Sequence, residues 1–189
     1  MEIKPDHEYA WDGLGDALRS QEKYSEAEAA YRKQIELKPD HEYAWSNLAI
    51  SLWIQGLPDD AATAFVEHLK YHPKDTITLA NDASLALMQG NTERCLNRVE
   101  AALTLTSPQD GLFAILPFLA WVASPTAQRL QSVIVAIEQL DPLVTTFEWD
   151  FSYNIPALER LTEKDRATAD ALIAFFEGKS SWETIKPSD

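Results

Sequence analysis

The chain has 189 residues, of which 46% are apolar, and a formal charge of −14 at pH 7. This apolar content suffices for a hydrophobic core and excludes a wholly disordered chain. With 16 Lys and Arg residues against 30 Asp and Glu, the chain lacks the basic stripe that phosphate contacts need, so we expect no nucleic-acid partner. The acidity either keeps a helical surface in solution or faces a basic partner, and the sequence leaves both open.

Glycine is scarce, at 6 residues, which favours helices over the turns of an all-β chain. The single cysteine, Cys95, excludes an intramolecular disulfide, and we expect a reducing, cytoplasmic location. No basic and then apolar leader begins the chain, and its longest apolar run, 112–123, is too short to cross a bilayer. We therefore predict an all-α protein that does not associate with membranes.

An octapeptide is repeated early in the chain. Residues 4–11, Lys-Pro-Asp-His-Glu-Tyr-Ala-Trp, recur unchanged at 38–45, an offset of 34. A period of this size is typical of helical units that bury their apolar faces only by stacking on neighbours. Because residues 1–4 match 35–38 in residue type, we interpret 1–5 as the end of a truncated preceding repeat, with a natural start at Met1 as the alternative.

The first complete unit, 6–39, is predicted to form two helices. Asp6 can cap the first helix and Ser25 the second, and Pro39 ends the second. Apolar and small residues at helical spacing form one stripe on each helix. They are Trp11, Leu14, Gly15 and Leu18 on the first helix, and Ala27, Ala30, Tyr31, Ile35 and Leu37 on the second.

The second unit, 40–73, repeats this arrangement. Its turn is Gly56-Leu57-Pro58, and Pro58 suits the first position of a helix, where the missing N–H removes no hydrogen bond. The equivalent stripes consist of Trp45, Leu48, Ala49 and Leu52, and of Ala61, Phe65 and Leu69.

These two units resemble tetratricopeptide repeats (TPRs). The family pattern is present as Trp11, Leu14, Gly15, Ala27, Tyr31 and Pro39, and again as Trp45, Leu48, Ala49, Ala61, Phe65 and Pro73. Leu18 and Leu52 depart from it, because the family often has Tyr there. The resemblance implies a right-handed α-solenoid of antiparallel helix pairs, in which Gly15 or Ala49 lets the paired helices approach closely. It also implies that the first helices line a concave groove for peptides or partner helices.

The 34-residue period continues approximately beyond the two units that carry the TPR pattern. Residues 74–108 are predicted as a degenerate third repeat with its turn at Gly90, and 109–142 as a fourth, TPR-like helix pair. The first helix of the fourth pair, 111–123, is apolar nearly all round, so we expect it to be buried on both sides.

The C-terminal region loses the period. We predict that 143–178 caps the solenoid, with a specialised docking element as the alternative. Within it, we expect a loop or extended segment over 145–153 and a short helix over 154–161. A longer helix follows, with Thr162 and Asp165 as a capping pair at its start and Gly178 at its end. Residues 179–189 are predicted to form a loose tail that Trp182 anchors.

No catalytic or cofactor motif emerges. His7 and His41 are equivalent residues of two repeats, and His68 and His72 lie four apart on a helix without a nearby third ligand. We expect the latter to be an exposed pair. The sequence contains no Gly-rich phosphate loop and no nucleophile elbow, and Cys95 lacks a convincing base. We therefore predict no enzyme activity, no metal and no cofactor.

The resemblance implies that partner-binding residues are those of the first helices that point away from the apolar stripes. They are Tyr9, Asp12, Gly13, Asp16 and Arg19 in the first unit; Tyr43, Asn47, Ile50, Trp53 and Ile54 in the second; and Ile77, Asn81, Ser84 and Met88 in the third. Asn47 and Asn81 recur at the repeat period and resemble an asparagine ladder that grips peptide backbones, with a purely structural role as the alternative.

Two further features bear on the partner. Trp53 either forms the anchor pocket of the groove or is covered by the C-terminal segment. Asp12 and Asp16 stand where the family's clamp for a chaperone carboxylate would have Lys, Arg or Asn, so we predict a basic or neutral partner.

The predicted function is a non-enzymatic protein-interaction module or scaffold. The alternative is the C-terminal regulatory or substrate-recruiting arm of a larger multidomain enzyme or signalling protein. Self-association, with copies stacked end to end through the first unit, is a third hypothesis.

Overall fold

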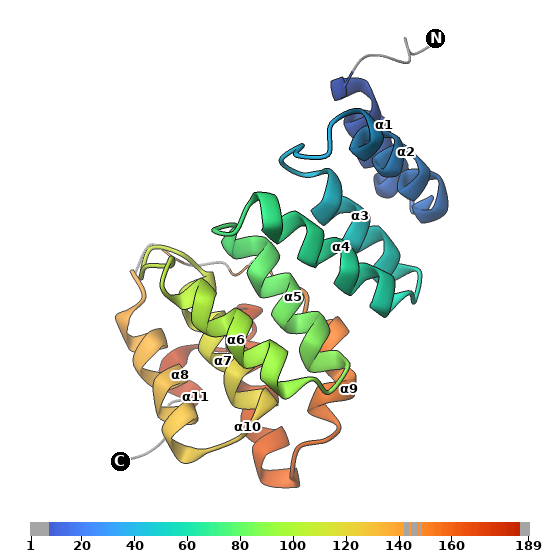
Figure 1. The fold of residues 1–189 in the computed structure, drawn as a ribbon. Coiled ribbons are helices and arrows are strands. Elements are labelled where there is room, and N and C mark those ends of the chain that lie inside the picture. The colour runs from blue at the N-terminus through green and yellow to red at the C-terminus, as the bar shows by residue number, and fades with distance from the viewer. Residues whose placement is uncertain (1–7, 142–143, 145–146, 148, 186–189) are drawn as a thin grey trace. The chain divides into compact units, whose positions relative to one another are not determined.

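The computed structural model describes residues 8–141, 144, 147 and 149–185. Every regular element among them is a helix (Figure 1). The helices of the repeats are α1 (Glu8–Ser20), α2 (Tyr24–Leu37), α3 (Ala44–Ile54), α4 (Pro58–Tyr71), α5 (Thr76–Met88), α6 (Thr92–Leu103), α7 (Leu112–Ala123) and α8 (Ala127–Gln139). The C-terminal region adds the 3-10 helix η1 (Phe151–Asn154), α9 (Ile155–Leu158), α10 (Glu163–Phe176) and α11 (Trp182–Ile185). Residues 1–5, Asp6 and His7 lie outside the described residues.

The chain divides into two compact units that are each larger than one repeat, Met1–Thr78 and Leu79–Asp189. From here on, the first unit and the second unit are these two parts. In the first unit, α1 packs against α2, α2 against α3, and α3 against α4. In the second, α7 packs against both α6 and α8. Consecutive helices are therefore neighbours in each unit, as expected for helix pairs joined by short turns.

The 34-residue period is visible in the helix starts and in the turns before them. Helices α2, α4 and α6 begin at Tyr24, Pro58 and Thr92. Each preceding turn contains one residue with positive φ, at 60° for Glu22, 77° for Gly56 and 75° for Gly90. The same two hydrogen bonds close all three turns, and they are those of a Schellman helix end. In the first turn they run from Glu22 N to Arg19 O (2.9 Å) and from Lys23 N to Leu18 O (2.9 Å).

The core of the first unit depends on small residues opposite aromatic ones. A Cβ added to Gly15 would lie 2.4 Å from Cε1 of Tyr31, so only glycine fits between these two helices. Tyr31 and the equivalent Phe65 are completely buried, as are Ala27 and Ala61. The role of Gly15 predicted from the sequence, close approach of the paired helices, is confirmed.

In the second unit, Cys95 and Val99 occupy the positions equivalent to Ala61 and Phe65 and are also buried. Helix α7 is buried on nearly all sides, as its composition predicted. Phe118 of α7 contacts Phe151 of η1 and Phe176 of α10 edge-on, at ring distances of 5.5 and 5.6 Å. This aromatic cluster attaches the C-terminal segment to the last helix pair.

Several local predictions need correction. Ser25 does not cap α2, because the helix begins at Tyr24 and the Ser25 hydroxyl donates instead to Gln55 Oε1 at 2.7 Å. Residues 151–154 form a 3-10 helix rather than an extended segment, and α9 ends at Leu158 rather than near 161. Within the predicted tail, 182–185 is helical.

Two predictions for the C-terminal region are confirmed. The Thr162 hydroxyl accepts a hydrogen bond from Asp165 N at 3.2 Å and so caps α10. The ring of Trp182 lies 5.8 Å from that of Phe175 and anchors α11 to α10. None of the helices in the described parts of the chain combines the length and the apolar character needed to cross a bilayer.

Candidate functional site

Asp16 joins three helices in the first unit. Its Oδ1 accepts hydrogen bonds from Tyr31 Oη of α2 at 2.8 Å and from Asn47 Nδ2 of α3 at 3.4 Å. Arg19, one turn further along α1, forms an ion pair with the same oxygen at 3.5 Å. Burial, together with the bond to Asp16, raises the pKa of Tyr31, so the phenol remains a neutral donor.

Asp12 lies one helical turn before Asp16 on α1 and carries a second carboxylate. Its Oδ1 is buried and has no hydrogen-bond partner among the described residues. Burial raises the pKa of Asp12, outweighing the nearby charges of His41 and Arg19, which lower it. The face of α1 therefore carries two carboxylates and one arginine, and one carboxylate oxygen lacks a donor.

The other predicted residues of the first unit differ in accessibility. Tyr43 and Ile77 are 50% and 63% exposed, whereas Trp53 is only 8% exposed. Ile50 and Ile54 are partly buried. The side chain of Tyr9 lies outside the described residues. A Cβ at Gly13 would meet nothing within 4 Å, so this position, equivalent to Asn47, is open.

In the second unit, the C-terminal segment lies against α5. Ser84 is buried, and its hydroxyl accepts a hydrogen bond from Asn154 Nδ2 at 2.6 Å. The guanidinium of Arg160 donates to the carbonyls of Leu87 (2.8 Å) and Met88 (3.0 Å) at the end of the helix. Ser84 was predicted to bind a partner, but this contact closes it to ligands, and we exclude it from the candidate site. Met88 and Asn81 are partly exposed.

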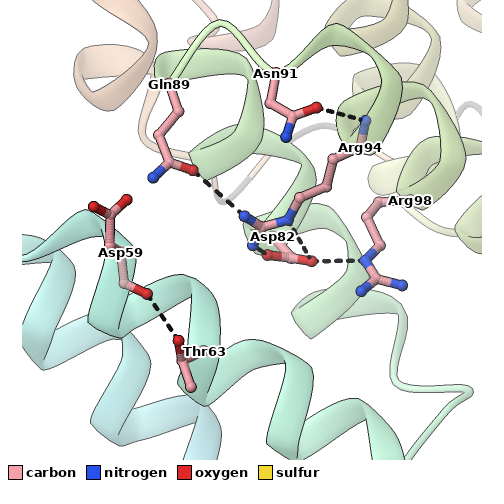
Figure 2. A network of polar contacts seen from close by, with 7 residues as sticks. All are labelled: Asp59, Thr63, Asp82, Gln89, Asn91, Arg94 and Arg98. Carbon is pink, nitrogen blue, oxygen red and sulfur yellow. Dashed lines mark hydrogen bonds and ion pairs between the residues drawn. The ribbon is translucent and has the colours of Figure 1, made fainter.

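A buried ion cluster joins α5 to α6 (Figure 2). The carboxylate of Asp82 is fully buried and accepts a 2.6 Å hydrogen bond from Nε of Arg98. Arg94 pairs with the other carboxylate oxygen. Asp82 replaces the apolar Leu14 and Leu48 of the first two repeats, and Arg98 replaces Ala30 and Ala64. An ion cluster thus takes the place of apolar packing in this pair.

The histidine pair differs from its prediction. His68 is fully buried rather than exposed, and its Nε2 lies 2.8 Å from the Asp75 carboxylate that caps the start of α5. The rings of His68 and His72 are 4.9 Å apart. The described residues contain no group of three or more side chains placed to hold a metal ion.

Burial raises the pKa of Cys95 to about 12, so its thiol stays neutral near pH 7.

A family model described as a TPR repeat matches residues 15–56. This segment, less than a quarter of the chain, matches the tetratricopeptide-repeat pattern. The matched segment includes Asp16, Arg19, Tyr31 and Asn47, the four residues of the three-helix junction. No curated protein is similar enough in sequence to count as a relative.

Solved TPR and related structures resemble the chain in fold. MamA aligns over 96% of this chain and 97% of its own, with a TM-score of 0.62 and 15% identity. PilW, a type IV pilus biogenesis factor, aligns over 90% and 70%, with a TM-score of 0.57 and 16% identity. The first TPR of Spaghetti (RPAP3), solved with the HSP90 peptide SRMEEVD, aligns over 73% and 96%, with a TM-score of 0.52 and 12% identity. The predicted fold class, an all-α protein of TPR-like helix pairs, is confirmed.

Some residues that contact the repeats escaped prediction. Asn154 and Arg160 contact α5 across 70 or more residues of sequence, and no local pattern indicates such contacts. The Asp82 cluster was detectable in the sequence, because an acidic and a basic residue replace apolar residues at equivalent positions of the repeat. Comparing equivalent positions of the three repeats would have found that pair.

Proposed function

We propose that this chain is a non-enzymatic protein-interaction module, and that the face of its first unit around Asp12 and Asp16 binds an extended peptide or partner helix of basic or neutral character. The observation that carries the proposal is the Asp16 junction. Hydrogen bonds from Tyr31 and Asn47 hold this carboxylate in place, so a partner meets a fixed negative group. Tyr43, Ile50, Ile54 and Ile77 supply apolar contact area in the same unit, whereas the nearly buried Trp53 contributes little exposed surface.

The charge of this face argues for a basic partner. Asp16 already has donors, but Asp12 retains a carboxylate oxygen without one. A lysine, an arginine or an N-terminal amine of the partner would supply a charge-assisted hydrogen bond there after a small rearrangement. Asn47 of the same unit would add amide contacts to a peptide backbone.

The peptide bound to RPAP3 provides a contrast. Its sequence, SRMEEVD, carries three acidic side chains, which would face Asp12 and Asp16 here and be repelled. We expect this chain to prefer a partner of the opposite charge, so its specificity differs from that of the RPAP3 repeat.

Fluorescence anisotropy with two labelled peptides tests the proposal. One peptide is SRMEEVD, and the other is SRMKKVK, in which lysines replace its three acidic residues. We expect the chain to bind the basic peptide more tightly, and binding to weaken with added salt. Asp12→Asn and Asp16→Asn should each weaken it by about two- to fivefold, the range for partly exposed charge pairs.

Asp40→Asn is the matched control, because it removes the same charge from the exposed turn between α2 and α3. It should leave the affinity unchanged. Equal affinity for the two peptides, or the same loss in all three variants, would mean that the Asp12 and Asp16 face is not the binding site.

A further inference from the structure

The last helix pair of the second unit carries an apolar hollow on its surface. The hollow has a volume of about 440 Å³ and is lined by residues of α7, of α8 and of the end of α6. Its apolar lining residues are Leu103, Phe113, Pro117, Val135 and Ala136, and its polar ones are Gln128, Gln131, Ser132 and Gln139. Val135 is 38% exposed although it is a large apolar side chain.

None of the lining residues is charged, although 24% of the chain is. With a formal charge of −14, two copies of this chain repel each other over most of their surfaces. This repulsion is weakest where the surface carries no charge, and there apolar burial favours contact. The hollow is therefore suited to contact between copies.

Five of the exposed residues of α8 form an uncharged, self-complementary stripe, and the exposed Glu138 lies just outside its edge. Gln128, Gln131, Ser132, Val135 and Gln139 fall within an arc of about 100°, given 3.6 residues per turn. If two such helices cross antiparallel at Val135, Gln131 of one copy lies opposite Gln139 of the other, and the reverse holds by symmetry. An amide both donates and accepts, so each Gln131–Gln139 pair can form a hydrogen bond without a charge.

Pro117 removes one helical hydrogen bond from the part of α7 that lines the hollow. It lies inside α7 and has no N–H, so the carbonyl of Phe113, four residues earlier, lacks its helical donor. Both residues line the hollow. A glutamine side chain from a second copy can supply the missing N–H.

We propose that this face of α7 and α8 is a two-fold interface through which two copies of the chain associate, with their α8 helices antiparallel and crossing at Val135. The interface is isologous, so the same residues serve both copies. Because only this helix pair of each copy makes the contact, we expect a weak association, with a dissociation constant between about 1 μM and about 1 mM.

Sedimentation equilibrium over this concentration range provides the first test. The parent chain should shift from monomer to dimer as its concentration rises. Val135→Glu should leave it monomeric throughout, because it places a like charge at the two-fold axis. Val66→Glu is the matched control, since Val66 of α4 is also 38% exposed, and this variant should dimerise like the parent.

A charge-pairing experiment tests the register. Chains with Gln131→Lys and Gln139→Lys should be monomeric, and so should chains with Gln131→Glu and Gln139→Glu. An equimolar mixture of the two should form a heterodimer at least as tight as the parent dimer. Circular dichroism of each variant checks that the fold is retained.

A parent chain that stays monomeric at every concentration would overturn the proposal, and the hollow would then belong to a different partner. A dimer that Val135→Glu leaves intact would also overturn it. If the parent chain dimerises but the mixture of the two variants forms no heterodimer, the antiparallel register would be refuted.

Discussion

The three Schellman turns allow a backbone effect to be measured at equivalent positions. Glu22, Gly56 and Gly90 are spaced 34 residues apart and all have positive φ, but only the first is not glycine. A residue with a Cβ is disfavoured in this conformation by about 1–2 kcal/mol, whereas glycine loses about 0.5–1 kcal/mol more backbone entropy on folding. We therefore expect Glu22→Gly to raise the free energy of unfolding by about 0.5–1 kcal/mol.

The two glycines should respond in the opposite direction. A Cβ at Gly56 would meet nothing within 4 Å, so Gly56→Ala isolates the conformational cost, and we expect a loss of about 1 kcal/mol. At Gly90 the Cβ would also lie 2.7 Å from Nη1 of Arg160. Moving Arg160 weakens its hydrogen bonds to Leu87 and Met88, so Gly90→Ala should cost about 1 kcal/mol more.

Urea unfolding followed by far-UV circular dichroism measures all three effects. Glu22→Ala is the control, because it removes the carboxylate but keeps a Cβ at positive φ, and it should not stabilise the chain. If Glu22→Ala stabilised the chain as much as Glu22→Gly, charge removal rather than backbone conformation would explain the gain. A neutral Gly56→Ala would refute the reasoning for the whole series.

Two further predictions concern carboxylates held by side-chain hydrogen bonds, the buried Asp82 and the half-buried Asp75. Asp82→Leu should destabilise the chain by about 3 kcal/mol in urea unfolding, because it leaves Arg94 and Arg98 without their partner. Adding Arg98→Ala, which restores the residues of the first two repeats, should recover part of this loss, and no recovery would argue against the equivalence of these positions. Burial would raise the pKa of Asp75, but hydrogen bonds from His68 and Thr78 outweigh it and lower the pKa to about 2. Because the folded pKa lies below the usual value of 3.8, Asp75 contributes about 2 kcal/mol to stability above that pH, and this is lost as the pH falls toward 2. The difference in unfolding free energy between the parent and Asp75→Asn should therefore shrink between about pH 5 and pH 2, and a constant difference would contradict the assignment.

Much of the repeat architecture was predictable because it is local. The 34-residue period predicted that α2, α4 and α6 begin at equivalent positions, as they do. Glycine at 56 and 90 indicated the helix ends, and Glu22 shows that the repeat imposes this conformation even on a residue that does not favour it. The candidate site was partly predictable in the same way, because Asp12, Asp16 and Asn47 were identified from their positions in the repeat.

The sequence by itself determined the helix pairs and most of the residues buried within them, since spacing along one helix decides which side chains share a face. Leu37, predicted to lie on an apolar stripe, is an exception and is 42% exposed. Only the tertiary structure decided which polar groups meet. It buried Ser84 beneath Asn154, and it placed Tyr31 and Asn47 on the carboxylate of Asp16. It also buried His68 on Asp75. The physical reason is that a hydrogen bond depends on ångström-scale distances and directions, which packing sets and residue spacing does not encode.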